Sequence, residues 1–142
     1  MGPLSVPLAR LYFAEAVLAV EYLHSYGVVQ RDLKLEKHIK VTHFGLSKVG
    51  IKIPKTNIYK ELVEDITREF MDHEICGTPY YFAPELILKE GYGRPVDWWS
   101  LGTILHELLM GFVPFDGDSL TELYESVTNG QIYSSSLAEI GM

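Results

Sequence analysis

The segment from Leu8 to His24 carries apolar residues around most of a helix's circumference, and it constrains the fold more than any other feature. The residues concerned are Leu11, Phe13, Val17, Leu18, Val20 and Leu23. Pro7 suits the start of a helix, and Gly27 suits the position just beyond its end. A helix that is apolar nearly all round is normally buried among other elements. We therefore expect a globular, mainly α-helical chain built around this segment.

Further helices are expected later in the chain. Apolar residues recur every four positions from Ile58 to Phe70, which indicates an amphipathic helix. A short helix is expected at 83–88, and a stronger one from Val96 to Met110, with a proline before it and a glycine after it. Ser119, with a glutamate three residues later, has the spacing of a capping box and predicts the start of a last helix. One short extended run is expected at 39–41.

Composition and charge exclude several functional classes. Of the 142 residues, 47% are hydrophobic and 22% charged, which indicates a globular rather than a disordered chain. The net charge of -7, without a basic patch, argues against a nucleic-acid partner. Charged residues interrupt the apolar stretch Leu8 to Leu23 too often for a membrane span, so no membrane association is expected. Cys76 is the only cysteine, which excludes an internal disulfide and predicts a reducing, cytoplasmic location.

Five short motifs follow one another along the chain. They are Gln30-Arg31-Asp32-Leu33-Lys34, His43-Phe44-Gly45, Cys76-Gly77-Thr78-Pro79, Ala83-Pro84-Glu85 and Asp97-Trp98-Trp99-Ser100-Leu101-Gly102. Any one of them alone is a weak signal. In this order, behind an apolar helix, they resemble the large, C-terminal lobe of a protein kinase, and the first two resemble its catalytic loop and its metal-binding loop. The run Asp-Leu-Lys resembles the serine/threonine branch.

The chain resembles most closely the microtubule-associated serine/threonine kinases. The residues that suggest this are Gly45-Leu46-Ser47-Lys48-Val49-Gly50, Thr56-Asn57-Ile58-Tyr59, Arg68-Glu69-Phe70 and Val96-Asp97-Trp98-Trp99. The resemblance implies a truncated and degenerate lobe, without the small N-terminal lobe and the last helices. It predicts an extended lead-in at residues 1–7, a partial protein kinase domain at 8–132 and a frayed tail at 133–142.

The resemblance implies a catalytic role, in vestigial form, for three positions. Phosphoryl transfer needs a carboxylate aimed at the substrate hydroxyl, and Asp32 is the matching residue. Lys34 matches the lysine that helps to neutralise the transferred phosphoryl group. Thr78 matches the hydroxyl that hydrogen-bonds near both.

Other positions match residues with structural roles. Asp97 matches a buried acceptor of hydrogen bonds from the backbone of the catalytic loop. Glu85 matches a glutamate that pairs with an arginine of a later helix, which this sequence does not contain, so we expect Glu85 to face water. Gly45 is the glycine of the metal-binding motif. Gln30 replaces a loop histidine and can make part of that histidine's contacts.

The positions that would hold a metal ion are degenerate. Magnesium requires oxygen ligands in tight octahedral geometry. His43 stands where the resemblance places an aspartate, and Lys37 stands where it places an asparagine. Asp32 and His43 are also eleven residues apart, about seven fewer than in the family pattern. ATP and magnesium are the cofactors that the family implies, but we expect no metal site and no tight cofactor binding here.

Three interpretations remain open. The first is a catalytically inactive kinase fragment, since the sequence also shows no glycine-rich loop, strand lysine or partner glutamate. The second is a module that docks another protein through an apolar surface of the lobe, because large exposed apolar patches mark partner sites. The third is a weakly active kinase completed by another chain.

Overall fold

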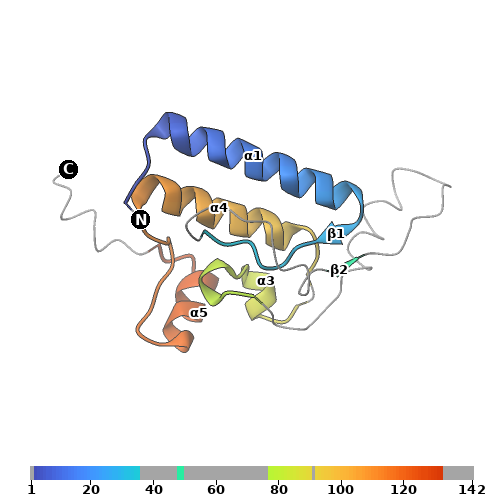
Figure 1. The fold of residues 1–142 in the computed structure, drawn as a ribbon. Helices are drawn as coiled ribbons and strands as arrows, with labels where there is room; N and C mark the ends of the chain where they lie inside the picture. Colours follow the sequence, from blue (N-terminus) through green and yellow to red (C-terminus); the bar gives the residue numbers. More distant parts are fainter. Residues whose placement is uncertain (1, 36–47, 50–76, 91, 133–142) are drawn as a thin grey trace.

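The computed structural model describes residues 2–35, 48–49, 77–90 and 92–132. In chain order its elements are α1 (Val6–Ser25), β1 (Val28–Val29), β2 (Lys48–Val49), the 3-10 turn η2 (Pro79–Tyr81), α3 (Pro84–Ile87), α4 (Pro95–Met110) and α5 (Leu120–Thr128) (Figure 1). The two short strands pair antiparallel, with Val28 opposite Val49. The described part of the chain is mainly α-helical, as the sequence predicts.

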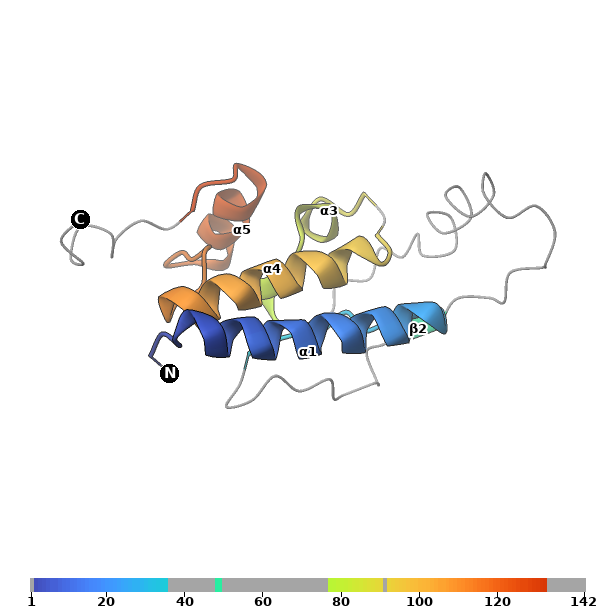
Figure 2. The same ribbon diagram turned by 90° about the horizontal axis from the view of Figure 1, so that it is seen from above.

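Helices α1 and α4 lie side by side along most of their length and form the centre of the fold (Figures 1 and 2). Their contact is made of residues that are at most 5% exposed: Ala9, Ala16 and Val20 from α1, and Leu101, Ile104 and Leu108 from α4. Small residues on α1 allow the two helix backbones to approach closely, since the distance between helix axes depends on the side chains at the contact.

Helix α1 begins two residues earlier than the sequence predicts. It runs from Val6 rather than Leu8, and it ends at Ser25. Pro7 therefore lies inside the first turn, where its missing N–H costs no hydrogen bond because first-turn amides have no partner within the helix. Only residues 2–5 of the described lead-in are non-helical, and the amide of Leu4 donates to the carbonyl of Leu108 at 2.8 Å, which ties this segment to α4.

The prediction that α1 is buried on most sides is wrong. Only its inner face packs against α4, and Leu11, Leu18 and Tyr22 on the outer face are 54%, 65% and 63% exposed. In the part of the chain that the structure describes, no element lies against this outer face (Figures 1 and 2). A helix that contacts one neighbour buries one stripe, whatever the apolar content of its other sides.

The ends of α4 and α5 follow their local sequence signals. Gly111 ends α4 in a left-handed conformation, with φ of 84°, and its amide donates to the carbonyl of Glu107. At the start of α5, the side chain of Ser119 accepts from the amide of Glu122 at 3.2 Å. The carboxylate of Glu122 reaches back to the amide of Asp118 at 2.9 Å. The predicted capping interaction is therefore present and satisfies amides that have no helical partner.

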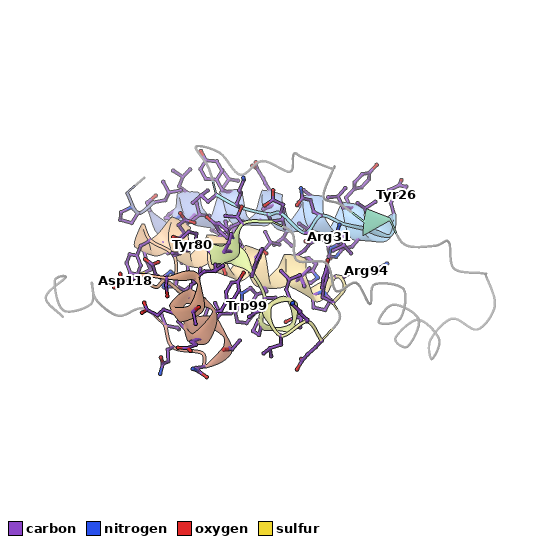
Figure 3. The ribbon with its side chains drawn as sticks, turned by 90° about the horizontal axis from the view of Figure 1, so that it is seen from below. Tyr26, Arg31, Tyr80, Arg94, Trp99 and Asp118 are labelled. Atoms are coloured by element: carbon purple, nitrogen blue, oxygen red, sulfur yellow. The ribbon has the colours of Figure 1, made fainter. Side chains whose placement is uncertain are left out.

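Aromatic side chains connect α4 to α3 and α5. Trp99 of α4 lies between these two helices (Figure 3) and stacks on Phe115, with ring centroids 5.7 Å apart. A second buried cluster joins β1, α3 and the start of α4: Val29, Phe82, Ala83, Leu86, Tyr92 and Val96. Because α4 contributes to each of these contacts as well as to the α1 pair, it organises the described fold.

Several predictions lie outside the described residues. These are the extended run at 39–41, the amphipathic helix from Ile58 to Phe70, the position of Cys76 and the tail at 133–142. Of the helices that the structure describes, none has both the length and the apolar content needed to cross a bilayer.

The α1–α4 contact predicts how stability responds to substitution. Leu101 is 1% exposed. Leu101→Ala is expected to lower the free energy of unfolding by about 2–5 kcal/mol, because it leaves a cavity between the helices. Leu18→Ala on the exposed face of α1 is the matched control and should change it by less than about 0.5 kcal/mol. Urea denaturation followed by circular dichroism measures both, and equal losses would contradict the packing described.

Candidate functional site

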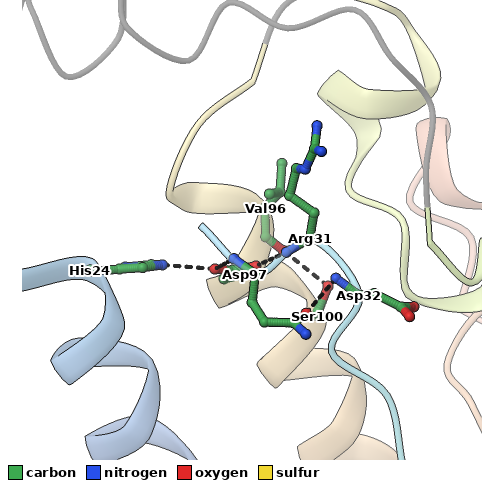
Figure 4. A network of polar contacts seen from close by, with 7 residues as sticks. His24, Arg31, Asp32, Val96, Asp97 and Ser100 are labelled. Atoms are coloured by element: carbon green, nitrogen blue, oxygen red, sulfur yellow. Dashed lines mark hydrogen bonds and ion pairs between the residues drawn. The ribbon is translucent and has the colours of Figure 1, made fainter. Parts of the chain in front are cut away.

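The loop that follows β1 is held by one buried carboxylate, that of Asp97 in the first turn of α4. The amide of Gln30 donates to its Oδ2 and the amide of Arg31 to its Oδ1, both at 2.9 Å (Figure 4). The ring Nε2 of His24, near the end of α1, lies 2.8 Å from Oδ2. Asp97 is 1% exposed, so these contacts replace the water that the carboxylate loses on burial. The backbone hydrogen bonds expected of Asp97 are therefore present.

The part played by His24 was not predicted from the sequence. His24 is buried, and its ring meets the edge of Trp98 with centroids 5.5 Å apart. The sequence offered one signal: a polar residue near the end of an otherwise apolar helix. If such a residue is buried, it almost always has a hydrogen-bond partner. The partner could not be named, since Asp97 lies 73 residues away.

Gln30 fixes the local shape of the loop through its side chain as well as its backbone. It is fully buried, and its Oε1 accepts from the amide of Asp32 at 2.7 Å. Such short-range side-chain-to-backbone bonds hold a turn in place of the helix or sheet pairing that a loop lacks. The hydrogen bond from the amide of Asp32 therefore depends on the side-chain oxygen of Gln30.

Arg31 occupies a backbone conformation that non-glycine residues rarely adopt. Its φ is 64°, and the left-handed region costs about 1–2 kcal/mol for such a residue. Its Nη1 donates to the hydroxyl of Tyr92 at 2.6 Å, and the guanidinium carbon lies 5.9 Å from the centre of the Tyr92 ring. Together with the bond from its amide to Asp97, these contacts hold Arg31 in the strained conformation.

The structure brings Asp32 and Thr78 together across 46 residues of sequence. The hydroxyl of Thr78 donates to Oδ1 of Asp32 at 3.1 Å. Gly77 allows this approach: its φ is 109°, and a Cβ at this position would lie 2.7 Å from the carbonyl oxygen of Arg31. Only glycine fits such a close backbone contact without displacing one of the two segments.

Lys34 lies on the same loop, two residues after Asp32. Both side chains are half-buried, whereas Leu33 between them is 2% exposed and packs into the core beside α1 and α4. Burial of Leu33 anchors the middle of the loop, and the two charged residues flank this anchor.

The end of the loop is held by Tyr81 of η2, a contact that the sequence did not reveal. The Tyr81 hydroxyl accepts from the amide of Leu35 at 3.3 Å and donates to the carboxylate of Glu107 at 2.5 Å. The hydroxyl of Ser100 donates to the Tyr81 carbonyl at 2.9 Å. The loop is therefore tied to α4 at both ends, by Asp97 at its start and through Tyr81 at its end.

Glu85 was expected to face water, and the structure shows that it does so only in part. Glu85 lies in the first turn of α3 and is half-buried rather than fully exposed to water, because α3 packs its adjacent residue Leu86 into the core. Lys37, His43 and Gly45 lie outside the described residues. Their contribution to a cofactor site rests on their chemistry alone.

Comparison with known proteins identifies the class to which this fold and loop belong. The sequence model of the protein kinase domain family matches residues 2–139 of this chain. The probable serine/threonine protein kinase IRE of Arabidopsis thaliana is 38% identical over 93% of this chain and 13% of its own length. The cAMP-dependent protein kinase catalytic subunit of Arthrobotrys oligospora is 40% identical over 89% of this chain and 22% of its own length.

The human serine/threonine-protein kinase Sgk2 is 41% identical over 85% of this chain and 31% of its own length. The chain belongs to the protein kinase family, and the relatives named here are serine/threonine kinases. It spans less than a third of the length of each of these relatives. The loop held by Asp97 contains the run Gln30 to Lys34, which resembles the catalytic loop of this family.

Removal of the Asp97 carboxylate tests its role as the anchor of this loop. Asp97→Ala removes the carboxylate that accepts from the amides of Gln30 and Arg31, so the free energy of unfolding should fall by about 3 kcal/mol. Hydrogen exchange at these two amides should accelerate in the same variant. Asp116→Ala is the control, because Asp116 also accepts from a backbone amide, that of Gly117, but is only half-buried. A loss no larger than the control's would contradict the anchoring role.

Proposed function

We propose that this chain is a catalytically inactive member of the serine/threonine kinase family, a pseudokinase whose catalytic loop keeps its shape but cannot use magnesium-ATP. The observation that carries the proposal is that Lys37 and His43 stand at both metal-ligand positions of the sequence, whereas the loop before them is well held by hydrogen bonds. Asp32, Lys34 and Thr78 are then vestigial catalytic residues.

The donor set does not fit the cofactor that the family uses. Protein kinases hold their magnesium ions through an aspartate and an asparagine, both of which supply oxygen. An imidazole at His43 suits softer metals, and the ammonium group of Lys37 repels a cation. Metal ions supply several kcal/mol of stabilisation to the transferred phosphoryl group, so their loss lowers the rate by orders of magnitude.

Two finer assignments accompany the proposal. The motifs from Gly45 to Gly50 and from Val96 to Trp99 support kinship with the microtubule-associated serine/threonine kinases within the family. The single cysteine supports a reducing, cytoplasmic location.

Nucleotide titration tests the inactive assignment. We expect millimolar ATP to shift the melting temperature by less than about 1 °C, with or without magnesium, because no bound ligand stabilises the folded state. Calorimetric titration of the same samples should give no heat of binding that depends on magnesium, and no phosphate should reach a basic test peptide.

Asp32→Asn, which removes the vestigial base, is the control for the phosphate-transfer assay. A melting shift of several degrees that requires magnesium, or phosphate transfer that disappears in Asp32→Asn, would overturn the inactive assignment. Phosphate transfer that appears only when a second chain is added would instead favour a weakly active kinase completed by that chain.

A second candidate function is the docking of another protein. The motivating observation is the exposure of two large apolar side chains one helical turn apart on α1: Leu18 is 65% exposed and Tyr22 63%. Exposed apolar residues that lie together mark partner sites or lead to aggregation. This function does not require nucleotide and is compatible with a loop that is kept only for its structure.

Size-exclusion chromatography with light scattering tests the docking role. Chain purified through an affinity tag is expected to elute in a complex of defined mass, with the partner present in a fixed ratio and identified by mass spectrometry. Reconstitution of that complex from the two purified proteins is the control. Elution as a monomer alone, or as aggregate without defined mass, would contradict the docking role.

A further inference from the structure

We draw no further inference here: the strongest candidate, the half-buried side chain of Arg94 at the N-terminal end of α4, whose Nε is buried without a hydrogen-bond partner among the described residues, carries no proposal because nothing in the described part of the chain shows which group covers it.

Discussion

The hydrogen bonds to Asp97 connect the elements on which the described fold depends. A carboxylate that is 1% exposed would be costly to bury without partners, and here it has donors from the loop backbone and from His24. These donors come from α1 and from the loop, while Asp97 itself belongs to α4. Moving any of the three would take at least one of these donors away from a buried carboxylate. Their relative positions are therefore coupled by one side chain.

The shape of the loop after β1 and its proposed chemistry depend on different groups. Shape depends on Asp97, on the bond from Gln30 to the amide of Asp32, and on the close approach that Gly77 allows. Under the proposed function, metal binding would depend on oxygen donors at two other positions, where the sequence has Lys37 and His43. The hydrogen bonds that hold the loop are made within the protein and do not need an ion. A well-formed loop is thus insufficient evidence of catalysis.

Helix α1 is apolar on two faces, and in the described part of the chain α4 covers one of them. Its inner face uses Ala9, Ala16 and Val20 to approach α4 closely, and burial there contributes to stability. Its outer face exposes larger side chains, such as Leu18 and Tyr22. Apolar content alone predicted burial on both faces. Both faces have helical spacing, and they differ in that the buried contact residues Ala9, Ala16 and Val20 are smaller than the exposed leucines and tyrosines.

The sequence by itself determined the features that depend on neighbouring residues. Gly111 ends α4, Ser119 caps α5, and the motifs around Asp32 and Asp97 identified the loop and its anchor, because caps, turns and motifs act over a few positions. Only the tertiary structure decided which distant groups meet. His24 pairs with Asp97 across 73 residues of sequence, and Tyr81 pairs with Glu107 across 26.

The exposure of α1 and the partial burial of Glu85 were likewise decided by tertiary packing. Helical periodicity shows which residues share a face, but it does not show whether another element covers that face. Coverage depends on how separate helices pack, and α1 has α4 on one side of it among the described elements. Glu85 is half-buried because α3 packs Leu86 into the core. The sequence therefore specified the helices and the loop, and the packing of α1, α3 and α4 determined which of their surfaces remain accessible.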